Sequence, residues 1–148
     1  MLDFAQFRAV VEHTPLISID LIVYNSDGEV LLGKRNNAPA KDYYFVPGGR
    51  IYKNEKIADA FHRVCLSEIG MDIDLSEAKF FGVFEHFYSD SFVSEDVNTH
   101  YVVLAYELHL NLNLSDLPFS QHEEYIFLDV QSARHNEKVH AYTQQYFN

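Results

Sequence analysis

Apolar and polar residues alternate along this chain with two periods, and each period predicts a kind of element. From Phe4 to Val11 the apolar residues recur at helical spacing, which predicts a short N-terminal helix that ends before Pro15. Over residues 16–24 apolar and polar side chains alternate, which predicts a strand with one apolar face. Ser26-Asp27-Gly28 is typical of a turn, so the returning strand of a hairpin is expected over Glu29–Gly33.

The rest of the chain carries strand signals on either side of one clear helix. Aromatic residues predict a short strand over Tyr43–Val46, ended by a backbone bend at Pro47-Gly48-Gly49. A helix is expected to open at Lys53 or Asn54 and to end at Gly70. Its buried stripe would consist of Ile57, Phe61, Val64 and Cys65. The remaining predicted elements are strands over Lys79–Phe87, His100–Leu110 and Tyr125–Asp129, a polar loop long enough for a lid over Ser89–Thr99, and a closing helix over Val139–Phe147.

Mixed strands around one central helix favour an α+β fold, built as an α/β/α sandwich with a mixed central sheet. No repeat and no Pro/Gly/Ser-rich linker divides the chain, so we expect one domain over residues 1–148. A content of 47% hydrophobic and 22% charged residues is that of a globular protein.

Charge and cysteine content exclude several classes of function. The chain has 22 acidic and 11 basic side chains, a net charge of −11, which argues against nucleic-acid binding and against docking on an anionic membrane. The single Cys65 cannot form an internal disulfide, which fits a reducing compartment. The sequence shows no secretory signal and no stretch that could span a bilayer, so we expect a cytoplasmic protein.

One stretch, from Gly49 to Met71, carries residues at the spacing of a catalytic motif. It reads GRIYKNEKIADAFHRVCLSEIGM and resembles the Nudix box, G-x5-E-x7-R-E-U-x-E-E-x-G-U, in which U is aliphatic. The positions that match are Gly49, Glu55, Arg63, Glu68, Gly70 and Met71. Two glutamates of the pattern are replaced, by Val64 and Ser67. The resemblance implies a Nudix-like fold.

The chemistry of this stretch can also be argued from its residues. Glu68 falls on the apolar stripe of the helix, where a carboxylate is unusual. It is either a paired acid at a helix end or, together with a backbone carbonyl and water, part of a shell suited to Mg²⁺. Too few carboxylates remain for several metals and a metal-activated base. The protein is therefore either inactive or takes its base from another segment.

The candidate for that base is His122, whose ordinary pKa near 6.5 suits proton transfer near neutral pH. The alternative is a surface histidine beside two acids. Lys34, Arg35 and Arg50 form a local group of cations that could meet a phosphate, although they could also be a solvated face. Arg63 is expected to pair with Glu55 in a structural role.

The altered box, together with other segments, resembles the GDP-mannose mannosyl hydrolase branch of the Nudix superfamily. These segments are Phe7–Val11, Thr14-Pro15-Leu16, Asp20, Leu31–Arg35, Phe45–Arg50, Gly82-Val83, His86–Tyr88, Thr99–Leu104 and Gln121-His122. Members of that branch hydrolyse the sugar's anomeric carbon bond, with inversion, rather than a bond at phosphorus. The resemblance therefore implies hydrolysis of GDP-mannose, or of GDP-glucose, to GDP and free hexose by a homodimer.

The resemblance also implies roles for residues around a metal. One Mg²⁺ per subunit would be held by the Gly48 carbonyl, Glu68 and Gln121, and His122 would act as general base. A metal-bound GDP is a good leaving group, so the scheme is that of an inverting glycosidase whose acid is replaced by a metal.

The same resemblance implies residues for the two ends of the substrate. Arg35 would bind the diphosphate, Tyr101 and Arg50 would help to carry the charge of the leaving GDP, and Asp20 would arrange the sugar, with His86. The guanine would meet Met1, Leu2 and Phe7, although Phe7 could instead be a core aromatic.

Two other functions remain open at this point. One is a Nudix pyrophosphohydrolase that attacks phosphorus in a nucleoside diphosphate derivative. The other is a non-catalytic Nudix-like module that binds nucleotide sugars.

Overall fold

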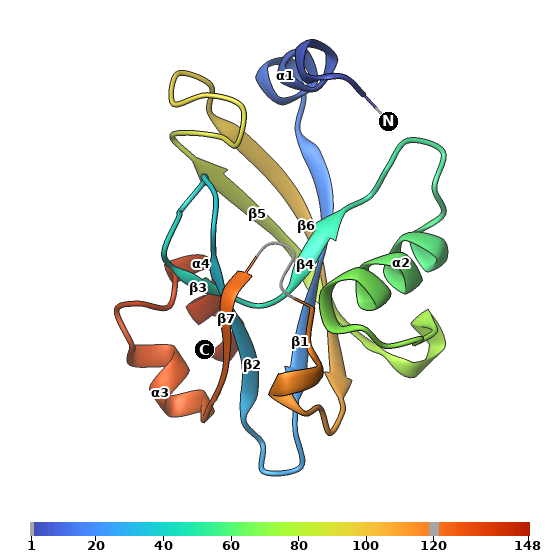
Figure 1. Cartoon of the computed structure of the whole chain (residues 1–148), viewed down its shortest axis with the longest axis vertical. Coiled ribbons are helices and arrows are strands. Elements are labelled where there is room, and N and C mark those ends of the chain that lie inside the picture. The colour runs from blue at the N-terminus through green and yellow to red at the C-terminus, as the bar shows by residue number, and fades with distance from the viewer. Residues whose placement is uncertain (1, 119–121) are drawn as a thin grey trace.

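The computed structural model describes residues 2–118 and 122–148, with only the backbone of His122 and Glu123. In this part of the chain the strands form one seven-stranded sheet with the order β3-β2-β1-β6-β5 (Figure 1). Strand β4 pairs in addition with β1, and β7 pairs with β2. Because β1 runs parallel to β6 and antiparallel to β2 and β4, the sheet is mixed, as expected.

The strands are β1 (Leu16–Tyr24), β2 (Val30–Arg35), β3 (Tyr44–Phe45), β4 (Gly48–Arg50), β5 (Lys79–Tyr88), β6 (Thr99–His109) and β7 (His122–Leu128). The helices are α1 (Phe4–His13), α2 (Ile57–Ile69), α3 (Val130–His135) and α4 (Ala141–Gln144), and short 3₁₀ turns cover Leu75–Glu77, Leu114–Asp116 and Gln145–Phe147. No described helix is long and apolar enough to cross a membrane.

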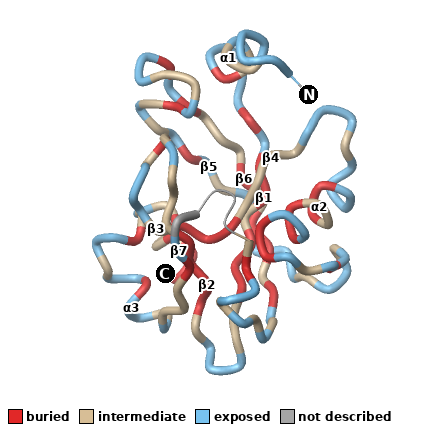
Figure 2. Tube along the Cα trace, viewed as in Figure 1, coloured by how far each residue is buried: buried red, intermediate tan, exposed pale blue. Residues whose placement is uncertain are grey.

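Two separate apolar cores lie on the two faces of the sheet. On one face, Ile19 and Leu21 pack with Phe61 and neighbouring residues of α2. On the other, Ile22 packs with residues of the C-terminal segment such as Tyr146. Figure 2 shows the buried positions concentrated in the strands between these layers. The expected α/β/α sandwich is therefore confirmed.

Strand β1 is buried on both faces, so the expectation of one apolar face is wrong. Ile19 and Ile22, which point to opposite faces, are both fully buried, whereas Ile17 is 49% exposed. The cause is long-range: β6 pairs with β1 along its whole length, and helices cover both sides.

Helix α2 begins later than expected, at Ile57 rather than at Lys53 or Asn54. Asn54 has a φ of 70° and belongs to the turn before the helix. As the first helical residue, Ile57 is 44% exposed and lies outside the buried stripe, contrary to the expectation. The other predicted members of the stripe are fully buried: Phe61, Val64 and Cys65. Gly70, with a φ of 68°, ends the helix as expected.

Two further segments differ from the expectation. Gly48–Arg50 is strand β4, paired with β1, instead of an open bend. The predicted closing helix over Val139–Phe147 is only α4 followed by a 3₁₀ turn, in which Tyr146 is buried. Helix α3 was not expected; the side chain of its N-cap, Asp129, accepts a hydrogen bond from the backbone N–H of Ser132.

Candidate active site

The candidate site lies where β1 and β2 separate. In the described part of the chain these strands pair at Tyr24 and Val30, next to their turn. Beyond that point β1 pairs with β4, and β2 pairs with β3 and β7. Asp20 therefore lies on one side of the opening, and Arg35 lies on the other.

Asp20 is a partly buried carboxylate with close neighbours on both sides. Tyr146 donates a hydrogen bond of 2.5 Å from its Oη to Asp20 Oδ2. A Cβ at Gly48 would lie 2.5 Å from both Asp20 Oδ1 and the Ile19 carbonyl oxygen, so a side chain does not fit there. Burial raises the pKa of Asp20 to about 6, while the Tyr146 hydrogen bond and the charge of Arg35 lower it. Asp20 can therefore gain or lose a proton near neutral pH.

Arg35 and Arg50 bring positive charge to the same region. The guanidinium carbon of Arg35 lies 5.4 Å from the ring centroid of Phe45, and that of Arg50 lies 4.5 Å from that of Phe7. Burial raises the pKa of Tyr101, and both arginines lower it, so Tyr101 lies within electrostatic reach of both. Two guanidinium groups around a neutral phenol suit the binding of a diphosphate.

The backbone of His122 is paired with Arg35 in the register of β2 and β7. This pairing brings the start of β7 to the same opening as Arg35. Lys34 lies opposite Glu124 in that register. The register shifts between Lys34 and Arg35, so the simple alternation of strand faces does not apply at this step. The predicted group of Lys34, Arg35 and Arg50 stays a prediction.

Helix α2 presents one buried carboxylate to this end of the sheet. Glu68 is 3% exposed, and Tyr125 of β7 donates a hydrogen bond of 3.3 Å to its backbone carbonyl. Burial raises the pKa of Tyr125 to about 12, and the negative charge of Glu68 contributes. Val64, one turn earlier, packs against Gly49, where a Cβ would lie 3.2 Å from a Val64 methyl group. The place of one replaced glutamate is thus filled by buried apolar side chain.

The second replaced glutamate, Ser67, is exposed and donates a hydrogen bond of 3.3 Å to the Val64 carbonyl. The expected pair of Arg63 and Glu55 is confirmed, with nitrogen–oxygen distances of 2.7 and 3.0 Å. Arg63 also donates a hydrogen bond of 2.6 Å to the Arg50 carbonyl, so it holds the strand that carries Arg50.

The donor chemistry near α2 fits a hard divalent cation. A buried carboxylate and a nearby glycine backbone are oxygen donors of the kind that Mg²⁺ takes. Of the three predicted ligands, the structure describes Gly48 and Glu68, while Gln121 lies outside the described residues. Another group of metal-ligating type, made up of His62, Asp72 and Asp74, has its ligand atoms within 4.8 Å of one another. Its two carboxylates are exposed.

The residues predicted for guanine lie near the N-terminus and α1. Leu2 is 46% exposed, and Met1 lies outside the described residues. Phe7 is partly buried and packs with Val11 and Leu16, while Arg50 covers its ring. Phe7 is therefore both a packed aromatic and a neighbour of the predicted diphosphate group.

His86 is buried, at 5% exposure, and its ring stacks on Tyr142 with a centroid distance of 4.3 Å. Burial lowers the pKa of His86 to about 4, so the ring is neutral at pH 7. No hydrogen-bond partner is found for its Nε2 among the described residues. His86 thus lies in the aromatic layer behind the site.

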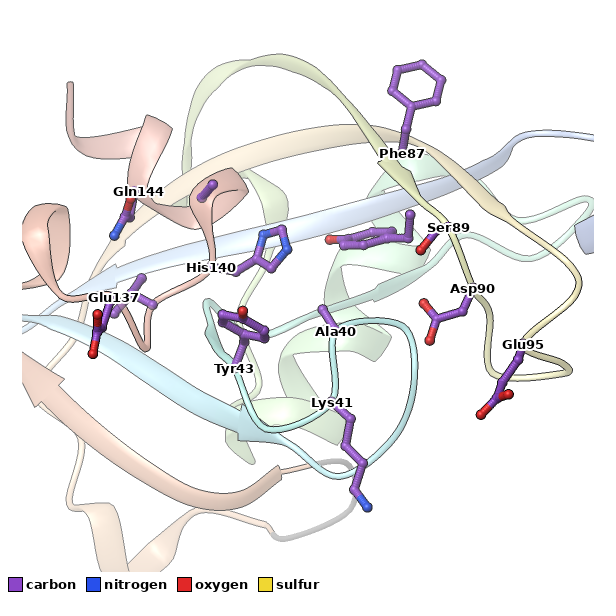
Figure 3. Close-up of a pocket in the computed structure, with 13 residues that line it drawn as sticks. Ala40, Lys41, Tyr43, Phe87, Ser89, Asp90, Glu95, Glu137, His140 and Gln144 are labelled. Carbon is purple, nitrogen blue, oxygen red and sulfur yellow. The ribbon is translucent and has the colours of Figure 1, made fainter.

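Two residues near the site were not singled out in the sequence: His140 and Tyr146. The His140 ring stacks on Phe45 at 4.7 Å, and Phe45 in turn carries Arg35. No short-range pattern connects Tyr146 with Asp20, because the two residues are 126 positions apart. His140 also lines a cleft of about 920 Å³ (Figure 3).

Known proteins agree with this fold. A family model described as the NUDIX domain matches residues 14–147. The chain is 36% identical over 143 residues to the low-salt glycan biosynthesis protein Agl8 of Haloferax volcanii, a match that covers 97% of this chain and 86% of that protein. The fold is similar to the crystal structure of the MutT protein from Methanosarcina mazei Go1, with a TM-score of 0.73, 18% identity and coverage of 91% and 92% of the two chains.

It is also similar to the MutT NUDIX hydrolase from Burkholderia pseudomallei, with a TM-score of 0.71, 21% identity and coverage of 91% and 97%. At these identities the two structures support the fold. The family model, in contrast, covers nearly the whole sequence and includes the stretch from Gly49 to Met71. On these grounds the chain belongs to the Nudix hydrolase family.

Proposed function

We propose that this Nudix hydrolase cleaves GDP-mannose, or GDP-glucose, to GDP and free hexose by attack of water at the anomeric carbon with inversion. The observation that carries the proposal is the composition of α2. Its one buried carboxylate is Glu68, and Val64 fills the neighbouring place with apolar side chain. Such a site supports binding of one metal ion better than activation of a water by several carboxylates at phosphorus.

The relative from Haloferax volcanii supports a sugar-containing substrate. Its name places it in glycan biosynthesis, where activated sugars are the reactants. Nudix hydrolases act on small nucleotide derivatives and generally use a divalent metal. A nucleotide sugar is a small nucleotide derivative, and its diphosphate can bind a divalent metal. The pair of Arg35 and Arg50 supplies positive charge for that diphosphate.

The chain's own residues divide the work as follows. Gly48, Glu68 and Gln121 would hold one Mg²⁺, which when bound neutralises charge on the diphosphate and makes GDP a better leaving group. Arg35, Arg50 and Tyr101 would stabilise the negative charge that develops on GDP.

On the sugar side, His122 would take a proton from the attacking water, and Asp20 would orient the sugar or the water. The pairing of Arg35 with the backbone of His122 supports this assignment, since it brings these two positions to one opening. Met1, Leu2 and Phe7 would contact the guanine, and His86 would support the aromatic layer under the sugar. General-base help is typically worth 10²–10⁴-fold in rate.

We further propose that residues 1–148 work as one cytoplasmic domain in a homodimer. Strand β5 supports self-association, because it is an edge strand with exposed apolar side chains. Those above half exposure are Phe80, Val83 and Phe87.

The position of bond cleavage tests the proposal directly. Hydrolysis of GDP-mannose in ¹⁸O-water is expected to place the label in the hexose, and the first-formed anomer should be inverted. Label in a phosphate would instead support the pyrophosphohydrolase, and binding without turnover in Mg²⁺ would support a non-catalytic module.

Two variants and one control test the residues. His122→Gln should lower kcat by about 10²–10⁴-fold, whereas His135→Gln, an exposed histidine of α3, should leave it unchanged. Glu68→Gln should weaken Mg²⁺ binding and activity together. A near-normal rate for His122→Gln would remove the base assignment.

A further inference from the structure

The cleft beside the site is bounded by three segments that are far apart in the sequence. Figure 3 shows them as the loop at Ala40 and Lys41, the segment after β5 with Asp90 and Glu95, and the segment before α4 with His140. Its volume of about 920 Å³ is at the upper end of the range for small-molecule sites. The cleft therefore has room for a hexose together with substituents.

One wall of the cleft is continuous with the candidate active site. Tyr88 lines the cleft, and its pKa is raised mainly by burial, with Asp20 raising it further and Arg35 lowering it. His140 also lines the cleft and stacks on Phe45, the ring that carries Arg35. A ligand whose diphosphate lies at Arg35 would thus extend its next group towards this cleft.

Aromatic side chains form this wall. Tyr43 meets the His140 ring edge-on at 5.3 Å, and Tyr88 lies 5.5 Å from the same ring. Burial and the charge of Arg35 lower the pKa of His140, so this wall is uncharged at neutral pH. Aromatic rings with hydroxyl groups can pack on the C–H faces of a sugar and hydrogen-bond its hydroxyls.

The rim of the cleft has the opposite sign to the diphosphate site. Its charged residues are Asp90, Glu95 and Glu137 against one cation, Lys41. Their summed field is negative, and it disfavours an additional anion on a ligand in the cleft. The arrangement separates the anionic part of a nucleotide sugar, at the two arginines, from its neutral part.

We propose that this cleft receives the sugar, and that Asp90, Glu95 and Glu137 make the enzyme selective for neutral sugars over uronic acids. The inference rests on the proposed function in taking a nucleotide sugar as substrate. It adds three specificity-determining residues that lie outside the segments of the Nudix motif. A carboxylate at C6 of the hexose would face this rim, whereas a hydroxymethyl group would not be repelled.

The test compares GDP-mannose with GDP-mannuronate, which differ in the group at C6. For the wild-type protein, kcat/KM should favour GDP-mannose by about tenfold or more, and 0.5 M salt should reduce the preference. The triple variant Asp90→Asn, Glu95→Gln, Glu137→Gln should lose about fivefold or more of it. A matched triple variant at exposed acids elsewhere, Glu12→Gln, Asp27→Asn and Asp59→Asn, should keep it.

Two results would overturn the inference: equal kcat/KM for the two compounds in the wild-type protein, or the same preference in the rim variant as in the wild type. The ¹⁸O position is measured in the same reactions. A wrong assignment of the cleaved bond is therefore distinguished from a wrong assignment of the residues that determine selectivity. If neither compound is hydrolysed, the ratio of their Kd values by calorimetry decides between the same outcomes.

Discussion

Tyr146 is expected to control the protonation of Asp20, and Tyr146→Phe tests this with the loss of a single hydroxyl group. In the wild-type protein the phenol donates a 2.5 Å hydrogen bond to Asp20 Oδ2 and lowers the pKa of that carboxyl. Tyr146 is 3% exposed, so little water can replace the lost donor. The substitution should therefore disfavour the ionised form of Asp20.

The size of the effect follows from the hydrogen bond. A hydrogen bond to a charged group contributes about 1.5–3 kcal/mol, and one pKa unit corresponds to about 1.36 kcal/mol. The pKa of Asp20, about 6 in the wild-type protein, should rise by about one to two units. At pH 7 the ionised fraction would then fall from about nine tenths to about half or less.

The assay is a titration of the Asp20 carboxyl carbon by ¹³C NMR, combined with the pH profile of kcat/KM. Both the titration midpoint and the acidic limb of the profile should move to higher pH in Tyr146→Phe. Tyr142→Phe is the matched control, because the Tyr142 hydroxyl bonds the Phe87 backbone and not Asp20. An unchanged or lower midpoint in Tyr146→Phe would show that the hydrogen bond does not stabilise the ionised carboxylate.

Three further predictions concern stability. Asp20→Asn should raise the free energy of unfolding at pH 8 by up to about 3 kcal/mol, because folding raises the pKa of this carboxyl from 3.8 to about 6. In urea melts this gain in stability should vanish below pH 4. A gain that persists below pH 4 would contradict this cause. The Tm of the wild-type protein should fall between pH 7 and about pH 4.5, because His86 binds a proton in the unfolded chain but not in the folded one, where its pKa is lowered to about 4. His86→Phe should reduce this fall in Tm. An equal fall in both proteins would refute the prediction. Gly48→Ala should lower the free energy of unfolding by about 1–3 kcal/mol, because the new Cβ would lie 2.5 Å from two oxygen atoms. Gly49→Ala should lower it less in the same melts, because its Cβ would lie 3.2 Å from a Val64 methyl group. Equal losses of stability would show that the backbone at Gly48 can move to make room.

Sequence patterns within one segment predicted those helices and strands whose bounds depend mainly on the residues of that segment. The bounds of α1, β5 and β6 differ from the expected ones by a residue or two, because apolar and aromatic residues run through each segment. The pair of Glu55 and Arg63 joins the turn before α2 to the middle of that helix, only eight positions later. In these cases the residues that determine the structure lie close together in the sequence.

Long-range contacts decided what the sequence did not predict. Burial of both faces of β1 depends on β6, whose paired residues are more than 80 positions away in the sequence. Gly48 has no room for a side chain because β1 lies against it, and not because of a turn of its own. The hydrogen bond from Tyr146 to Asp20 depends on how the C-terminal segment packs on the sheet. The aromatic wall and the acidic rim likewise bring together separate loops.

The contacts of Arg63 suggest that the two halves of this motif can vary independently. Its guanidinium group binds Glu55, supports the strand of Arg50 and covers the ring of Tyr52 at 3.9 Å. None of these contacts involves position 64 or 67, where the chain departs from the pattern. Substitutions at positions 64 and 67 can therefore change the charge of the helix face while Arg63 continues to brace the loop before α2.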